Sequence, residues 1–507
     1  MAERAARWWP RAVVGFGTAA VALATGEVAA AFVRPEAAPV IAIGNRFVTL
    51  TPEWLKAFAT RDLGTSDKTV LIGGIYVVVA LLALPLGYLA ERNLGLAVGV
   101  VVAFGALAMY GSLTAAAPKA GDFIPSAVAT VAGVVALIGL QHAAAGWRSG
   151  TAPNRRAFLV TAAIAAGVVA VGEFAGRAWQ RSRFSAAPSR AAVRLPAPAS
   201  PAPALPAGAQ LDAATPFDTP NRDFYRIDIA LRVPQVAAET WQLRIDGMVD
   251  RPMTLTFAQL LARPMIERWI TITCVSNYVG GDLISTSRFL GTPLAPLLRE
   301  AGVHPTADQL FTHGKDGATI GVRTAAVLDG RDAMLAVGMN GEPLPIAHGF
   351  PVRMVVPGLY GYVSACKWID RITATTFDDR TAYWVARGWD AQAPIQLASR
   401  LDLPRPGAHV NVGDTITIAG VAWHQHAGIG AVEVQIDNQP WIGAKLGPAP
   451  SPDTWRQWSM RWTVSGAGPH TLTVRAVDTD GRTQIAVHRN PYPNAGSGLD
   501  SRTIVAH

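Results

Sequence analysis

Residues 268–282 read RWITITCVSNYVGGD, an apolar run that ends in a cysteine and passes directly into a polar, glycine-rich loop. The run is typical of a buried strand, and the glycines allow a ligand to approach the backbone of the loop. A single cysteine is most often an inert buried residue, yet Cys274, at this strand end, can offer a thiolate to a ligand. Thiolate prefers soft metal ions, but no second protein ligand lies nearby in the sequence. A one-cysteine metal site here therefore requires a cofactor that brings the other ligands.

The sequence around this stretch predicts two further kinds of structure. Between Asp223 and Thr376, short β-like runs such as residues 240–247 and 351–358 alternate with helical stretches, which predicts an α+β fold. From about Val410 onward, alternating strands separated by Gly-, Asn- and Asp-bearing turns predict a β-sandwich.

The composition indicates a membrane domain at the start of the chain. Of 507 residues 16% are charged, and the mean hydropathy is +0.24, whereas about 25% charged residues is typical of soluble domains. Five apolar stretches are long enough to span a bilayer, at about residues 12–33, 70–90, 94–117, 123–146 and 157–176. The outer two stretches each hold one acid, Glu27 and Glu173, which we expect at wet helix ends. We therefore predict five transmembrane helices within residues 1–180.

Short basic flanks predict the orientation of these helices. The arginines that flank the predicted spans on one side are Arg4, Arg7, Arg11, Arg92, Arg148, Arg155 and Arg156. The positive-inside rule assigns that side to the cytoplasm, so everything after the fifth helix is predicted to be extracytoplasmic. His142 is the only histidine before residue 300, so a haem with two histidine ligands is not expected within these helices.

The fifth stretch begins with NRRAFL at residues 154–159. Paired arginines followed by Phe-Leu and a weakly apolar segment resemble a twin-arginine export signal, which carries folded proteins. The alternative is that Arg155 and Arg156 only fix the topology.

Residues 181–220 are rich in Ala and Pro, which predicts an extended, semi-rigid linker that cannot bury a core. The net charge of +8 does not indicate a nucleic-acid partner, because much of the basic excess lies at the predicted membrane boundaries. Two cysteines, Cys274 and Cys366, cannot make a disulfide scaffold.

Several motifs, in order along the chain, resemble the sulfite oxidase family of molybdopterin enzymes. They are CVSN at 274–277, FLGTPL at 289–294 and MNGEPLPIAHGFPVRMVVPGLYGYVSACKWIDRI at 339–372, preceded by DFYR at 223–226 and TWQLRIDG at 240–247. The last strands resemble the immunoglobulin-like dimerisation domain of many members. The chain is therefore predicted to be multi-domain: the composition indicates an all-α transmembrane bundle at 1–180, and the resemblance implies an α+β molybdopterin-binding catalytic domain at 221–400 and an immunoglobulin-like β-sandwich at 401–507.

The resemblance also implies a molybdenum–molybdopterin cofactor, whose dithiolene supplies two sulfurs while Cys274 completes the metal sphere. The residues that match the family's cofactor contacts are Tyr225, Arg226, Thr312, His313, His348, Arg353, Ser364 and Lys367. Where the family pattern runs Ser-x-Lys-Trp, this sequence has one residue more, SACKW at 364–368, and we expect the additional Cys366 to be packed or adjacent to the pterin. Arg387 is predicted to attract an anionic substrate; the alternative is a salt bridge between the two soluble modules.

The expected function is that of an extracytoplasmic, membrane-anchored oxidoreductase. It would move an oxygen atom between molybdenum and a small oxyanion or sulfoxide-type substrate. Electrons are expected to pass to a separate cytochrome or quinone-linked partner. Membrane lipid and a second copy, bound through the C-terminal domain, are the other expected partners. The rival hypothesis is a non-catalytic membrane receptor or scaffold that has lost the metal, which the retained Cys274 and the HGFPVR motif at 348–353 disfavour.

Overall fold

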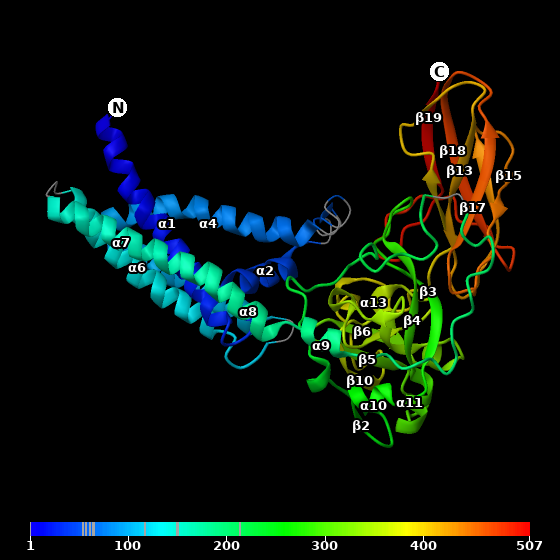
Figure 1. Ribbon diagram of the computed structural model, residues 1–507, viewed down its shortest axis with the longest axis horizontal. Coiled ribbons are helices and arrows are strands. Elements are labelled where there is room, and N and C mark those ends of the chain that lie inside the picture. Colours follow the sequence, from blue (N-terminus) through cyan, green and yellow to red (C-terminus); the bar gives the residue numbers. More distant parts are fainter. Residues whose placement is uncertain are drawn as a thin grey trace. The chain divides into compact units, whose positions relative to one another are not determined.

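The chain divides into two units (Figure 1). The first comprises Met1–Ser185 and Ile229–Gln235, and the second comprises Ala186–Asp228 and Val236–His507. The computed structural model describes residues 2–52, 55, 58–59, 62, 66–115, 118–148, 152–211 and 214–507. The predicted fold class, helices followed by a mixed α/β domain and a β-rich domain, is confirmed.

The first unit is helical. Its main helices are α1 (Ala2–Ala30), α2 (Pro39–Leu50), α4 (Asp67–Arg92), α5 (Leu94–Leu113), α6 (Ile124–Arg148), α7 (Ala152–Val171) and α8 (Arg177–Phe184). Five helices, α1, α4, α5, α6 and α7, contain segments long and apolar enough to cross a membrane, in agreement with the five predicted stretches. The third stretch was predicted to reach Ala117, but residues 116 and 117 lie outside the described residues. The sequence analysis did not identify α2, a shorter apolar helix.

Helices α1 and α4 approach each other closely at two glycines. A Cβ atom on Gly15 would lie 1.8 Å from the carbonyl oxygen of Ala83, and one on Gly87 would lie 1.9 Å from that of Arg11. Only glycine fits at these two points. Close packing of small residues is a main source of helix association in lipid, where no hydrophobic driving force holds helices together. An ion pair between Arg11 and Glu91 joins the same two helices.

Glu27 is buried, with 2% of its surface exposed, and does not lie at a wet helix end as predicted. Its carboxylate lies 3.1 Å from Nη2 of Arg232, which belongs to the segment Ile229–Gln235. Gln180 donates to the Glu27 carbonyl at 3.0 Å and accepts from Arg232 at 2.9 Å. The sequence could not reveal this partner, because Arg232 lies 205 positions after Glu27. The side chain of Glu173 lies outside the described part of the chain.

Two sheets form the α/β part of the second unit. One has the order β2-β1-β10-β5-β6; the other has the order β3-β4-β7-β8, with β9 paired to β7. Strands β1 and β10 are parallel, and the other pairs in these sheets are antiparallel. The strands are β1 (Gln242–Gly247), β2 (Met253–Thr256), β3 (Ile266–Thr273), β4 (Ile284–Pro293), β5 (Gln309–Gly314), β6 (Thr319–Arg323), β7 (Met334–Met339), β8 (Glu342–Pro343), β9 (Arg353–Val355) and β10 (Ile369–Thr375).

Short helices precede the first of these strands and follow several others. They are α9 (Ala187–Ala192), α10 (Phe257–Leu261), α11 (Leu294–Ala301), α12 (Thr324–Leu328), α13 (Gly361–Ser364) and the 3₁₀ turns Ala238–Thr240, Ile346–His348 and Val385–Arg387. Helix α11 buries Leu294, Leu297, Leu298 and Ala301. This spacing places one apolar face against the core, as expected of an amphipathic helix.

The C-terminal part of the second unit is a β-sandwich, as predicted (Figure 1). Its sheets have the orders β11-β13-β17-β16 and β12-β19-β18-β14-β15. Alternate residues such as Ile418, Val434 and Val474 point inward and form a core of their own. The strands are β11 (Ala398–Leu403), β12 (His409–Val410), β13 (Thr415–Trp423), β14 (Ile429–Ile436), β15 (Ile442–Gly443), β16 (Lys445–Leu446), β17 (Arg456–Thr463), β18 (Gly468–Asp478) and β19 (Asp500–Ala506).

The Ala/Pro-rich segment is not a free spacer, and our expectation that it buries nothing is wrong. Ser200 forms a parallel bridge with Ile266 of β3, and Phe217 is fully buried. The indoles of Trp269 and Trp455 each donate at 3.0 Å, to the carbonyls of Pro203 and Phe217. An extended proline-rich chain has no internal hydrogen bonds, so its carbonyls are available to such donors. Tertiary structure therefore turns the segment into part of the second unit.

The glycine contact between α1 and α4 gives a first prediction. We expect Gly87→Val to destabilise the chain by about 2 kcal/mol or more, because the new side chain must push two backbones apart. Thermal unfolding of the full chain in detergent measures this effect. Gly99→Val, on α5, is the matched control, since a Cβ there meets no atom within 4 Å. Equal loss of stability in both variants would contradict the close-packing role of Gly87.

Candidate cofactor site

Cys274 opens the tight loop that leads from β3 to β4. Its amide donates to the carbonyl of Leu283 at 2.9 Å, and its carbonyl accepts from the amide of Asn277 at 3.1 Å. The side-chain oxygen of Asn277 closes the loop by accepting from the Leu283 amide at 3.0 Å. Burial raises the pKa of the Cys274 thiol, while hydrogen bonds from Ser276 and the charge of Lys367 lower it. A thiolate at this position therefore needs a positive partner.

Tyrosine hydroxyls lie within electrostatic range of this thiol. Burial is the main cause that raises the pKa of Tyr225, Tyr360 and Tyr362, and a negative charge on Cys274 raises each of them further. The three phenols are therefore neutral. Tyr225 and Tyr360 can donate hydrogen bonds to a ligand beside the cysteine, whereas the Tyr362 hydroxyl already donates to the carbonyl of Asp390. The sequence analysis named Tyr225 but missed Tyr360 and Tyr362, which come from the run GLYGYVS at 358–364.

Arg353, on β9, is a buried guanidinium with few partners. It is 4% exposed, it donates from Nη1 to the His348 carbonyl at 3.2 Å, and its Nε has no hydrogen-bond partner. It makes no ion pair within the part of the chain that the structure describes. Burial lowers the pKa of Arg353 to about 10, so the side chain is still charged at neutral pH. A buried charge without a counter-ion is costly, so the site requires an anion.

His348 lies beside Arg353 as a neutral imidazole. Burial, followed by the charges of Arg353 and Lys367, lowers the pKa of His348 to about 3. Its ring meets the ring of Phe224 edge-on at 5.4 Å. The neutral ring can therefore accept or donate a hydrogen bond without adding charge to the pocket.

Lys367 and Arg226 share a single carboxylate, that of Asp228. Lys367 Nζ lies 2.6 Å and Arg226 Nε 2.8 Å from the same Asp228 oxygen, whose side chain is 1% exposed. The positive charges of Lys367 and Arg226 also lower the pKa of His348, so both side chains lie near the same pocket as Arg353. Sequence reasoning missed Asp228, although its position two residues after Arg226 on an extended segment was a usable signal.

The charge of the pocket fits an anionic cofactor. Two cations of the pocket, Arg226 and Lys367, pair with the buried carboxylate of Asp228, and the third cation, Arg353, makes no ion pair among the described residues. A second carboxylate, Asp316, lies close to Lys367 and Asp228, and burial raises its pKa to about 6. Even with Asp316 ionised, positive charge remains in excess. The orphaned Nε of Arg353 and the fork geometry of guanidinium suit phosphate oxygens.

Thr312 and His313 are neighbours on β5, and the resemblance implied that both contact the cofactor. Their side chains lie on opposite faces of the strand. The Thr312 hydroxyl donates to the carbonyl of Ile320 at 3.2 Å and lies close to the thiol of Cys366, whose pKa burial raises to about 12. His313 points to the other face of the strand, where its ring lies 5.2 Å from that of Phe311 and its strand partner is Arg371. Ser364 donates to the carbonyls of Leu359 and Tyr360, both at 3.0 Å.

Arg387 lies apart from these residues in its described contacts. Its guanidinium sits 3.5 Å from the centre of the Tyr383 ring and donates to the Tyr383 carbonyl at 2.7 Å. Its own carbonyl accepts from the hydroxyl of Tyr492, in the segment between β18 and β19, at 3.4 Å. These contacts place Arg387 at the seam between the two modules, held by an aromatic ring and carbonyls and not by the salt bridge considered above.

Comparisons with known proteins identify the fold and site. Residues 230–384 match the oxidoreductase molybdopterin binding domain family, and residues 399–474 match the bacterial Ig domain family. The chain is 31% identical over 320 residues to the mitochondrial sulfite oxidase of Drosophila melanogaster, covering 52% of this chain and 55% of that one. It is 30% identical over 314 residues to the sulfite oxidase of Gallus gallus, covering 52% of this chain and 67% of that one.

A solved structure shows the same fold. The sulfane dehydrogenase SoxCD from Paracoccus pantotrophus matches with a TM-score of 0.51 and 24% identity, covering 58% of this chain and 85% of that chain. The α/β domain and the pocket thus define a molybdopterin-binding domain, followed by an immunoglobulin-like domain. The chain belongs to the sulfite oxidase family, and it spans between about half and two thirds of the length of the two relatives named above.

The unpaired cation gives a second prediction. We expect Arg353→Met to lower retention of the pterin at least tenfold, because the site loses a buried charge for its anion. The same change should leave the thermal stability of cofactor-free chain unchanged or raise it, because an uncompensated buried charge is removed. Pterin fluorescence after denaturation and thermal unfolding provide the two measurements.

Arg475→Met is the matched control. Arg475 lies on the sandwich and pairs with Glu433 at 2.6 Å, so its loss should leave pterin content unchanged. Normal pterin content in Arg353→Met would contradict the anchoring role.

Proposed function

We propose that this chain is a membrane-anchored, extracytoplasmic molybdenum oxidoreductase that transfers an oxygen atom to or from a small oxyanion or sulfoxide-type substrate. The observation that carries the proposal is the juxtaposition of a buried cysteine with a pocket of buried cations in excess. Membership of the sulfite oxidase family supports it. When bound, molybdenum–molybdopterin supplies the two-electron oxygen-atom transfer, as cofactors supply the demanding chemistry in such enzymes.

The chain's own residues divide the work of binding. Cys274 would bind the metal as a thiolate, and the Asn277 turn would hold it in place. Arg353 and Lys367 would bind the anionic end of the pterin, and neutral His348 would hydrogen-bond it. Among the other predicted contacts, Tyr225 and Arg226 belong to the segment that leads into the pocket. The full set of contacts proposed for the cofactor is Tyr225, Arg226, Thr312, His348, Arg353, Ser364 and Lys367; His313, the eighth residue of the predicted set, points to the face of β5 opposite Thr312 and is not retained.

Side chains beside Cys274 would also act on the substrate. The neutral phenol of Tyr360 can donate a hydrogen bond to an oxyanion, and its burial limits competing water, whereas the Tyr362 hydroxyl already donates to the carbonyl of Asp390. Arg387 keeps its proposed role as an attractor of anions, exerted from the module seam through its field and not by direct contact with Cys274. Electrons would leave or enter through a separate cytochrome or quinone-linked partner, and the sandwich would support a homodimer.

The location of the soluble part rests on the arginine asymmetry and on the five apolar helices. Arg155 also has a structural contact, since its guanidinium lies 5.5 Å from the centre of the Trp147 ring. Phe158, three positions later, is fully buried against Trp9 and Trp147. The paired arginines would act in export before the helices assume this packing.

A third prediction separates the metal ligand from the second cysteine. Wild-type chain is expected to carry molybdenum in equimolar amount by metal analysis. Cys274→Ser should lower turnover at least a hundredfold and abolish the thiolate-to-molybdenum absorption, while pterin is retained through Arg353 and Lys367. Cys366→Ser should keep the turnover and the thiolate-to-molybdenum absorption of the wild type, because Cys366 is packed against Gly314 and Thr312.

Metal-free wild-type chain would favour the receptor or scaffold hypothesis instead. Equal loss of activity in the two serine variants would overturn the assignment of separate roles.

A fourth prediction concerns export. Changing both Arg155 and Arg156 to Lys keeps the charge but removes the planar guanidinium pair that a receptor can recognise. The four earlier helices should still insert, whereas the soluble part should stay on the cytoplasmic side, protected from protease added outside. Arg92→Lys is the control, because it changes another arginine on the same predicted side. A normally external, active soluble part in the double variant would show that the pair only fixes topology.

A further inference from the structure

The β-sandwich contacts the α/β domain at the strand that leads into Cys274. Strand β3 is the edge of its sheet, so one row of its backbone groups is unpaired by strands. The amide of Thr271 donates to the carbonyl of Asp453 at 2.9 Å. The amide of Trp455 in turn donates to the hydroxyl of Thr271 at 2.8 Å. The loop before β17 therefore completes the edge of the catalytic sheet.

Gln425, just after β13, reaches the residue that precedes the cysteine. Its side-chain amide donates to the hydroxyl of Thr273 at 2.9 Å and to the carbonyl of Thr271 at 3.3 Å. The side chain is 3% exposed, so water does not compete for these bonds. A buried hydrogen bond of this kind fixes the geometry of the groups that it joins.

The sandwich also holds the loop on the far side of Cys274. Arg400, on β11, donates to the carbonyl of Gly281 at 3.0 Å, and Asp402 fixes its guanidinium at 2.7 Å. Gly280 has a φ of +75°, and a Cβ there would lie 2.8 Å from a carboxylate oxygen of Asp500. Glycine is therefore required for the loop to lie this close to β19.

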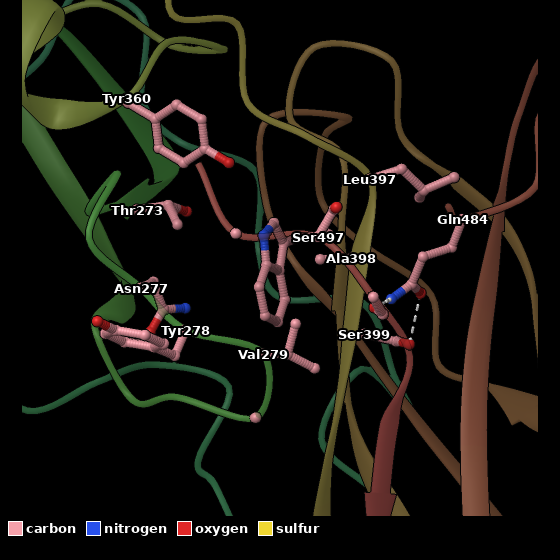
Figure 2. A pocket seen from close by; sticks show the side chains of 14 residues that line it. Thr273, Asn277, Tyr278, Val279, Tyr360, Leu397, Ala398, Ser399, Gln484 and Ser497 are labelled. Atoms are coloured by element: carbon pink, nitrogen blue, oxygen red, sulfur yellow. Dashed lines mark hydrogen bonds between the residues drawn. The ribbon is translucent and has the colours of Figure 1, made fainter. Parts of the chain in front are cut away.

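Little free space remains between the loop and the sandwich. Figure 2 shows Thr273, Asn277 and Tyr360 on one side of a small pocket, and Ser399, Gln484 and Ser497 on the other. The pocket has about 20 Å³, roughly the room that one water molecule needs. Ser399 and Gln484 are tied together at 2.7 Å. The loop thus cannot shift toward the sandwich without displacing packed side chains.

We infer that the sandwich is a positioning element for the metal ligand, with Gln425 and Arg400 as its positioning residues. Contacts from β11, β13, β17 and β19 or their loops reach the chain both before and after Cys274. Groups that orient a ligand from behind control the geometry and electronic properties of a metal site. The inference rests on the proposed function in one respect, the role of Cys274 as the metal ligand.

The experiment compares Gln425→Ala with Gln435→Ala in the full-length holoenzyme in detergent. Gln435 lies on the same sandwich and donates to Gln439 at 3.0 Å, with no contact to β3, so it is the matched control. We expect Gln425→Ala to speed hydrogen exchange of the amides in residues 274–283 at least tenfold. It should also shift the thiolate-to-molybdenum absorption and lower turnover about tenfold, with molybdenum content unchanged. Gln435→Ala should match wild type in all four measurements.

A second pair of variants tests the same bond from the other side. Thr273→Val removes the acceptor hydroxyl and should reproduce the effect of Gln425→Ala, whereas Thr273→Ser keeps the hydroxyl and should behave as wild type. Unchanged exchange and absorption in Gln425→Ala and Thr273→Val, at wild-type molybdenum content, would overturn the inference. A metal-free wild-type chain would instead overturn the proposed function, while the exchange measurement would still report on the positioning of the loop.

Discussion

The second unit depends on positive charge that is buried without enough counter-charge. Arg353 has no carboxylate partner in the described chain, and Arg226 and Lys367 both pair with Asp228. Such an arrangement costs folding free energy unless an anion completes it. The pocket lies where strands of two sheets, the 3₁₀ turn at His348 and the segment after the proline-rich chain converge. The fold tolerates the free-energy cost of the buried charge because these elements meet there. Binding of the cofactor is therefore expected to stabilise the domain as well as to supply its chemistry.

The helical unit buries charge in a different way, because Glu27 has a partner. It is paired with Arg232, a residue of the segment Ile229–Gln235 that lies far along the chain. Asp228, the residue before that segment, belongs to the second unit and pairs with Lys367. Glycine contacts bring α1 and α4 close together, and packing of small residues holds helices together where the hydrophobic effect cannot.

The sandwich and the proline-rich segment have a larger structural role than their sequences indicate. Both patterns were identified correctly as local structure: alternating strands in one case and extended chain in the other. Their contacts with β3 depend on indole donors, on Gln425 and on carbonyls that meet only in three dimensions. Hydropathy and spacing carry no information about such cross-domain hydrogen bonds. The positions of Arg387 at the seam and of His313 on the outer face of β5 were hidden for the same reason.

The sequence by itself determined the five apolar helices and the order of the three kinds of structure. These features follow from local composition, so they need no distant contact. Only the tertiary structure decided that Arg353 makes no ion pair within the described residues, that Asp228 pairs with both Arg226 and Lys367, and that Glu27 is buried. Burial and pairing depend on residues brought together from distant positions, and a chain read in one dimension does not specify which groups water can reach.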